Sequence, residues 1–164
     1  MRSSSILFAL GLICFSFLIS SCSSTGRMTQ PAPADRGIES PIVSTAKNYL
    51  GSRYRFGAAG PRQFDCSGFV YYVHQQHNIN PGRTTSDQSQ SGTRIRPNQA
   101  VPGDLLFFGK GRKMQHVGIV VSNNGSSLQM IHASSSRGVI IEDVYASPYW
   151  SGRLRFAVRG QTRS

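Results

Sequence analysis

The sequence of 164 residues is short of cysteine, of acidic side chains and of long apolar segments. It holds three cysteines, and its 7 Asp and Glu are outnumbered by 18 Lys and Arg, for a formal net charge of +11. A chain of this length makes one domain of ordinary size and has no room for two independent cores. No internal repeat is visible, which argues against a repeat architecture. We therefore expect one folded domain with one site.

The longest uncharged apolar run, residues 6–19, lies near the N-terminus. Its fourteen residues are fewer than the roughly 20 that a helix needs to cross a bilayer, which argues against a membrane-spanning helix. Arg2 precedes the run and small residues follow it, which is the layout of a secretory signal peptide. Residues 1–21 are therefore predicted to be a signal peptide.

The segment that follows is similar to a bacterial lipobox, Ile19-Ser20-Ser21-Cys22, in which the cysteine is acylated and becomes the new N-terminus. Cys14 fits that pattern poorly, because a bulky residue precedes it. Acyl chains anchor firmly, since each buried methylene contributes about 0.8 kcal/mol. Ser23 follows the cysteine, as in lipoproteins that are sent to the outer membrane. The resemblance implies a lipid anchor on Cys22, in the outer membrane facing the periplasm.

Cys66 is then the one cysteine of the exported domain, because Cys14 lies in the leader and Cys22 carries lipid. It has no partner for an intramolecular disulfide. A lone thiol in an oxidising compartment is exposed to oxidation, so its presence favours a function such as nucleophilic catalysis. A buried, inert core cysteine is the alternative that this observation leaves open.

The excess of basic residues favours an anionic partner. Without Arg2, 17 Lys and Arg remain against 7 Asp and Glu, a net charge of about +10. An exported lipoprotein meets little nucleic acid, whereas cell-wall polymers and lipid head groups are acidic, so we expect no nucleic-acid partner. The arginines are scattered along the chain, which favours a solvated basic surface over a dedicated binding patch.

Composition divides the rest of the chain into a tether and a domain. Residues 22–38 are rich in Ser, Thr, Pro, Ala and Gly, with almost no large apolar side chains, so they are predicted to be a flexible, lipidated tether. The folded domain is placed at residues 39–160. Apolar residues at helical spacing between 42 and 50 predict a first helix that stops at Gly51. A third, short helix is expected at 84–90.

The central helix is predicted to begin at or just before Cys66, since Asp65 can cap it and an apolar run, residues 69–73, follows. Turn residues at 78–82 end it. Strands are predicted afterwards at 104–108, 116–121, 128–132, 139–141 and 154–158, with a hairpin turn at 123–125. Helices followed by antiparallel strands favour an α+β domain, with one helix packed on a small sheet.

A cysteine at a helix N-terminus is placed for nucleophilic chemistry. The helix dipole and the unpaired amides favour the thiolate, so we expect the pKa of Cys66 to be lowered. The amides of Cys66 and Ser67 can also donate to a developing oxyanion. Gly68 either lets a substrate peptide pass close by or lets the helix pack closely on the sheet.

Two of the four histidines are candidates for the base that a cysteine nucleophile needs. His116 begins one predicted strand and His132 ends the next, so the hairpin can bring both to one end of the sheet. Together with Cys66 they would form a Cys-His-His row, although histidines on adjacent strands are more often ordinary surface or core residues. His74 and His77 are three residues apart, but no third metal ligand is evident, so we interpret them as exposed helix residues and expect no metal site.

Five blocks of the sequence are similar, in order and spacing, to the motifs of the NlpC family of cell-wall peptidases. The resemblance covers about residues 41–158, and the lipobox with the Ser-Pro-Tyr-Trp segment at 147–150 makes the chain especially similar to lipoprotein endopeptidases of the Spr (MepS) type. The blocks are Tyr54-Arg55-Phe56-Gly57, Phe64-Asp65-Cys66-Ser67-Gly68-Phe69-Val70, Pro102-Gly103-Asp104-Leu105, His116-Val117-Gly118-Ile119 and Ile131-His132-Ala133-Ser134.

This resemblance implies a papain-like α+β domain with Cys66 as nucleophile, His116 as base and His132 as third, polar member. It places Tyr54 near the oxyanion site, although an aromatic that fills the groove floor is the alternative. Asp65 is expected to orient the active-site loop or to cap the helix. No metal or organic cofactor is implied.

The implied function is a peptidoglycan endopeptidase that cleaves an amide in the peptide stems or cross-bridges through an acyl-enzyme on Cys66. Family members cut next to D-glutamate or diaminopimelate, or at the D-alanyl cross-bridge, and the sequence does not choose among these bonds. Two alternatives remain open: an acyl or amide transferase on the same scaffold, and a wall-binding lipoprotein without activity.

Overall fold

The computed structural model describes residues 39–111 and 113–160. The predicted signal peptide, the predicted tether and Cys22, the predicted acylation site, lie outside these residues. In the described part of the chain, no helix has both the length and the apolar character needed to cross a bilayer.

The predicted α+β class is confirmed, with most helices first and the main sheet after them. Six strands form one antiparallel sheet in the order β3-β8-β4-β5-β6-β7, and β1 and β2 form a separate parallel pair. The elements in chain order are α1 Pro41–Lys47, β1 Arg53–Tyr54, β2 Gln63–Phe64, α2 Cys66–Gln75, α3 Thr85–Gln88, β3 Gly92–Ile95, the 3-10 turn η1 Pro97–Gln99, β4 Leu105–Lys110, β5 Lys113–Asn123, β6 Leu128–Ser134, β7 Gly138–Asp143, α4 Pro148–Ser151 and β8 Leu154–Gly160.

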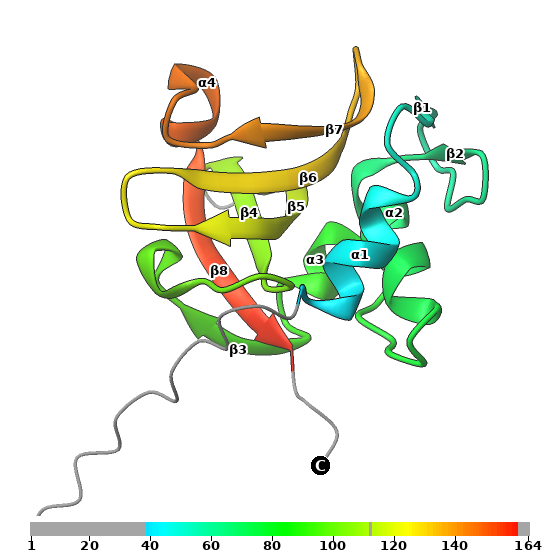
Figure 1. Ribbon diagram of the computed structural model, residues 1–164, viewed down its shortest axis with the longest axis horizontal. Helices are drawn as coiled ribbons and strands as arrows, with labels where there is room; N and C mark the ends of the chain where they lie inside the picture. Colours follow the sequence, from blue (N-terminus) through cyan, green and yellow to red (C-terminus); the bar gives the residue numbers. More distant parts are fainter. Residues whose placement is uncertain (1–38, 112, 161–164) are drawn as a thin grey trace, which may run out of the picture. The chain divides into compact units, whose positions relative to one another are not determined.

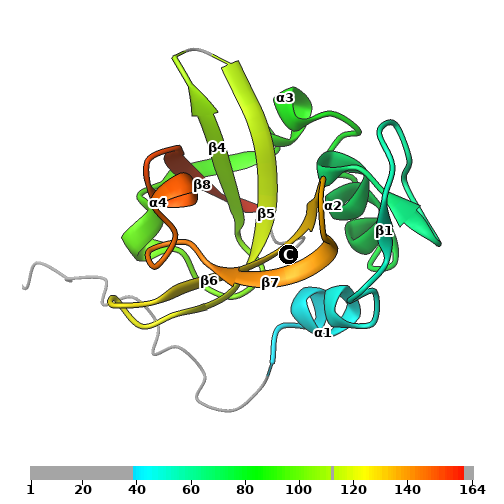
Figure 2. The same cartoon turned by 90° about the horizontal axis from the view of Figure 1, so that it is seen from above.

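Helices lie on both sides of the six-stranded sheet. Figures 1 and 2 show α1, α2 and α3 together on one side and α4 on the other. Strand alternation divides the apolar side chains in the same way, since successive residues of a strand point to opposite faces. Val117, Ile119 and Ile131 join the core cluster that includes α2, whereas Val120 and Met130 belong to the cluster that Trp150 of α4 covers.

Helix α2 begins at Cys66 because the carboxylate of Asp65 accepts a hydrogen bond from the Gly68 amide at 2.5 Å. It buries Phe69, Val70 and Val73 in the core, as the apolar run predicts. It ends at Gln75, and hydrogen-bonded turns continue the chain to Asn78, whose φ of 56° takes the backbone out of helical geometry.

The interpretation of His74 as an exposed helix residue is wrong. Its side chain is buried, and its Nδ1 lies 2.8 Å from the carbonyl oxygen of Val70, one turn back along α2. His77 lies just beyond the helix and its Nε2 is 2.8 Å from the Thr45 hydroxyl of the α1 segment. The His74 contact therefore lies within α2, whereas the His77 contact joins the end of α2 to α1. Within the described residues, no group of three or more His, Cys, Asp or Glu is placed to hold a metal ion.

Candidate active site

The N-terminus of α2 is held by a network centred on Asp65. Besides accepting from the Gly68 amide, Asp65 accepts from the Gly57 amide at 3.0 Å and from the two terminal guanidinium nitrogens of Arg83, at 2.8 and 3.2 Å. Burial raises the pKa of Asp65, but the hydrogen bonds from Arg83 and Gly68 outweigh it and hold that pKa below its usual range. Asp65 therefore both caps the helix and orients the loop before it, so the two interpretations of this residue combine.

Gly68 permits the same loop to approach the helix. A Cβ at this position would lie 2.1 Å from the carbonyl oxygen of Ala58 and 2.9 Å from the Asp65 carboxylate. The close approach is thus between α2 and the loop that contains Ala58, and not between the helix and the main sheet. The Ala58 carbonyl in turn accepts from the Asp65 amide at 2.8 Å, which fixes the loop against the start of the helix.

The pKa of the Cys66 thiol is raised and not lowered. Burial is the largest influence and raises its pKa, while a hydrogen bond from the Thr85 hydroxyl, 3.9 Å from the sulfur, and the backbone amides of Ser67 and Val117 act in the opposite direction. The expectation of a lowered pKa is therefore wrong, because loss of hydration outweighs the helix terminus. At neutral pH the thiol keeps its proton and needs a base to become a nucleophile.

The hairpin of β5 and β6 joins the two histidine rings, as the sequence predicts. Nε2 of His116 lies 2.8 Å from Nδ1 of His132, and the two rings are 86° apart. Gly118 makes room for this contact: a Cβ there would lie 3.2 Å from the Cβ of His132 and 3.0 Å from the sulfur of Met130. A residue without a side chain on β5 therefore lets the His132 ring reach across to His116.

Next to His132 lies a carboxylate that the sequence did not predict as part of the site. Oε2 of Glu142, on β7, is 2.9 Å from Nε2 of His132 and accepts from the indole N–H of Trp150 at 2.7 Å. The Trp150 ring packs on His116 and His132, with centroid distances of 4.7 and 5.1 Å. Arg137 forms an ion pair with the other oxygen of Glu142. The sequence predicted this strand only at 139–141. A prediction one residue longer would have placed the side chain of Glu142 on the same face of the sheet as His132, because side chains alternate between faces along a strand.

One cavity of about 400 Å³ brings the candidate residues together. His132 is fully buried behind His116 and does not line it. Burial raises the pKa of the Tyr54 phenol, and the nearby Cys66 and Asp65 add to that effect. The Ser67 side chain turns away and donates to Asp65 at 3.2 Å, so only its backbone amide faces the thiol. The cavity is lined in part by Tyr54, Cys66, His116, Glu142, Tyr149 and Trp150.

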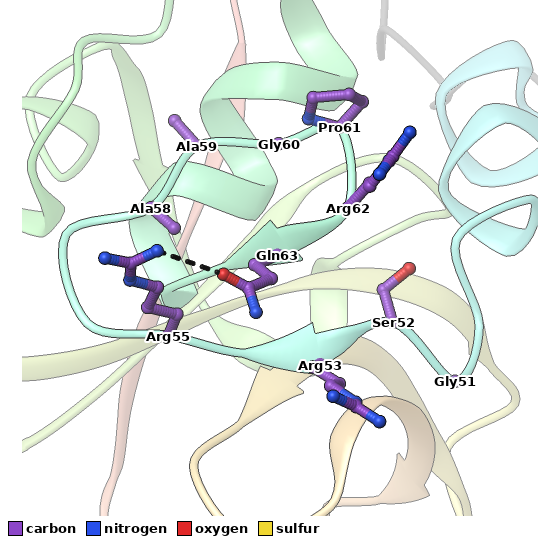
Figure 3. Close-up of a pocket in the computed structure, with 10 residues that line it drawn as sticks. All are labelled: Gly51, Ser52, Arg53, Arg55, Ala58, Ala59, Gly60, Pro61, Arg62 and Gln63. Atoms are coloured by element: carbon purple, nitrogen blue, oxygen red, sulfur yellow. Dashed lines mark hydrogen bonds between the residues drawn. The ribbon is translucent and has the colours of Figure 1, made fainter.

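A second hollow, of about 630 Å³, lies beside the β1–β2 pair and carries no comparable chemistry. Figure 3 shows that the side chains of Arg53 and Arg62 point in different directions and that Arg55 turns toward Gln63, to which it donates at 3.4 Å. Guanidinium groups that diverge in this way do not enclose one anion. They fit the solvated basic surface that the scattered arginines predict.

Both histidines are held neutral, and this gives a testable pH dependence of stability. Burial, with His132 nearby, lowers the pKa of His116 to about 3, and burial, with Arg137 nearby, lowers the pKa of His132 to about 4. The unfolded chain therefore binds more protons than the folded one below about pH 6.5. Stability is full above that pH and is expected to fall as the pH drops toward 4, by up to about 1.4 kcal/mol per pH unit for His116. The contribution of His132 is expected to be smaller, because the Glu142 carboxylate, 2.9 Å from its Nε2, favours the charged ring.

Urea denaturation at pH 7.5, 6.5, 5.5 and 4.5 measures this slope. The His116→Gln variant keeps a polar side chain of similar length and removes one titrating group, so its free energy of unfolding should fall less steeply. Equal slopes for the two proteins would mean that His116 does not contribute.

Comparison with known proteins identifies the family. The model of the NlpC/P60 family matches residues 51–159. The chain belongs to the NlpC/P60 family. The family resemblance of the sequence blocks is thereby confirmed.

Several members of the NlpC/P60 family carry informative names. The chain is 36% identical over 128 residues to the murein DD-endopeptidase MepS/murein LD-carboxypeptidase of Escherichia coli, covering 77% of this chain and 65% of that protein. It is 40% identical over 116 residues to the gamma-DL-glutamyl hydrolase of Bacillus subtilis, covering 68% of this chain but 27% of that protein. The chain thus spans only about a quarter of the length of the Bacillus relative.

Solved structures agree with the fold. The NlpC/p60 domain of the peptidoglycan hydrolase SagA has a TM-score of 0.62 at 37% identity, covering 73% of this chain and 96% of that one. A protein of Staphylococcus aureus described as similar to lipoprotein, NLP/P60 family, has a TM-score of 0.66 at 31% identity, covering 82% of this chain and 45% of that one.

Proposed function

We propose that the chain is a peptidoglycan endopeptidase with Cys66 as nucleophile, His116 as base and His132 as the group that orients His116. The observation that carries this proposal is the shared cavity of Cys66 and His116, with the second imidazole directly behind. The names of the murein endopeptidase and peptidoglycan hydrolase relatives support the substrate class.

The proposed reaction begins with a protonated Cys66 thiol and a neutral His116 imidazole. His116 takes the Cys66 thiol proton as the sulfur attacks the carbonyl carbon of a peptide bond in peptidoglycan. The amides of Cys66 and Ser67 precede the first intrahelical hydrogen bond of α2, from Phe69 to Asp65, so they are available to the oxyanion. His116 then protonates the leaving amine as the C–N bond breaks. Water, deprotonated by His116, cleaves the thioester and releases the acid and the thiol.

Tyr54 is proposed to act at the wall of the same cavity, close to the thiol. Its phenol keeps its proton, since burial raises its pKa, and can therefore donate a hydrogen bond to a substrate carbonyl. The side chains of Asp65 and Ser67 are assigned to holding the start of α2 rather than to substrate contact.

The roles of the remaining parts of the chain are proposed from the sequence alone. Residues 1–21 act as a signal peptide, Cys22 carries the lipid, residues 22–38 form the tether and residues 39–160 form the peptidase domain. The proposed place of the enzyme is the periplasmic side of the outer membrane. There the tether brings the domain to the cell wall.

Release of soluble muropeptides tests the proposal. The chain from residue 23 onward is incubated with purified peptidoglycan, beside Cys66→Ser, and the products are identified by mass spectrometry. Products that require Cys66 are expected, and their masses name the bond. Equal release by Cys66→Ser, or no release by folded wild-type protein, would contradict the proposal. Adducts formed with an added amine would instead indicate a transferase.

A further inference from the structure

Glu142 closes a row of hydrogen bonds that begins at the catalytic cavity. The contacts run from His116 Nε2 to His132 Nδ1 at 2.8 Å and from His132 Nε2 to Glu142 Oε2 at 2.9 Å, and Glu142 also lines the cavity. Among the described residues, every nitrogen of the two rings has a hydrogen-bonding partner except Nδ1 of His116. This leaves one ring nitrogen of the pair for the thiol.

The carboxylate decides which nitrogen of each ring carries the proton. A carboxylate only accepts hydrogen bonds, so Nε2 of His132 must hold the hydrogen that lies between them. A neutral imidazole has one N–H, so Nδ1 of His132 is an acceptor and Nε2 of His116 must donate to it. Nδ1 of His116 is then left with a lone pair, which is the state that a general base requires.

We propose that Glu142 is a positioning residue that fixes the tautomers of both histidines and so keeps Nδ1 of His116 ready to accept the Cys66 proton. This inference rests on the proposed function. The same carboxylate also stabilises the imidazolium that forms after proton transfer, through His132, because its charge lies at the end of the row.

The surroundings of Glu142 suit this role. Arg137 pairs with Oε1, while Trp150 donates to Oε2, the oxygen that also accepts from His132. Two donors at Oε2 hold that oxygen in place. The neighbouring Asp143 is directed elsewhere, to the Ser127 hydroxyl and to backbone amides that include that of Tyr145. Glu142 is thus the carboxylate of β7 that reaches the histidines.

Three variants separate the effect of the histidine tautomers from the effect of the negative charge of Glu142. Glu142→Leu removes the acceptor, so the two tautomer arrangements of the rings become comparable in energy. Glu142→Gln keeps a neutral carbonyl oxygen, which the two donors at Oε2 favour at that position. The amide NH2 then faces Arg137, whose exposed side chain can turn into solvent, so the variant preserves the tautomers while losing the charge. Asp143→Asn is the matched control, because it removes a charge from the same strand without touching the row.

The first measurement is the ¹⁵N chemical shifts of the histidine rings at pH 7. In the wild type, in Glu142→Gln and in Asp143→Asn, we expect protonated Nε2 and unprotonated Nδ1 in both His116 and His132. In Glu142→Leu the shifts should move toward averaged values. A protonated Nδ1 on His116 in the wild type, or unchanged shifts in Glu142→Leu, would overturn the inference.

The second measurement is kcat/KM for muropeptide release. Glu142→Leu is expected to lose roughly ten- to a hundredfold, Glu142→Gln less, and Asp143→Asn nothing. Full activity in Glu142→Leu would also overturn the inference. If the wild type releases no muropeptides while Nδ1 of His116 is unprotonated, the proposed function fails and the assignment of tautomers stands.

Discussion

Replacing His116 by Gln is expected to lower kcat/KM for muropeptide release about a thousandfold. The reason is the protonated state of the thiol, since burial raises the pKa of Cys66. An enzyme whose cysteine already rested as thiolate would lose less. Gln is neutral and cannot accept the proton, but it retains hydrogen-bonding capacity beside His132. Steady-state kinetics with purified peptidoglycan measure the loss.

The pH profile of His116→Gln distinguishes a missing base from a damaged fold. Hydroxide can remove the thiol proton when no imidazole does, so the residual activity should rise as the pH approaches the raised pKa of Cys66. His77→Gln is the matched control, because His77 bonds to Thr45, away from the cavity. Activity in His116→Gln close to that of the wild type would remove His116 from the mechanism.

Gly68→Ala is expected to damage both stability and activity. In an ordinary helix this substitution stabilises by about 0.5–1 kcal/mol. Here the new Cβ would lie 2.1 Å from the Ala58 carbonyl oxygen, which is backbone and cannot rotate away. The loop must move, and the hydrogen bond from the Asp65 amide to Ala58 is strained. We expect a loss of about 1–3 kcal/mol in urea denaturation and a large fall in kcat/KM.

Gly160→Ala controls for the loss of a glycine. A Cβ at Gly160 meets nothing within 4 Å, so its effect should stay within about 0.5 kcal/mol of zero. If Gly68→Ala is equally harmless, the loop does not depend on contact with the start of α2, and the explanation for Gly68 fails.

The sequence predicts the parts of the fold that have long periodic patterns. The central helix starts at Cys66 as expected, because Asp65 caps it, and the β5–β6 hairpin turns at the expected asparagines. Of the short elements, α3 was expected, at 84–90, but β1, β2, β3 and α4 were not predicted. β1 and β2 have two residues each and α4 has four, too few for a hydrophobic period to show.

The candidate site is predictable only in part. The hairpin predicted from the sequence places His116 beside His132, and the structure has the two rings in contact. The raised pKa of Cys66 depends on burial by several elements distant in sequence, and local pattern says nothing of it. Glu142 was missed because the predicted strand stopped at residue 141, one residue before it. Trp150 lies on a four-residue helix whose position only the tertiary fold defines.

Trp150 is the single tryptophan of the chain, and its indole packs against both imidazoles. The tryptophan fluorescence of this protein therefore originates at the site itself, because the chain has no second indole. A proton arriving on either ring, or a ligand entering the cavity that Trp150 lines, changes the surroundings of that one fluorophore. The molecule carries its own optical probe of the state of its histidines.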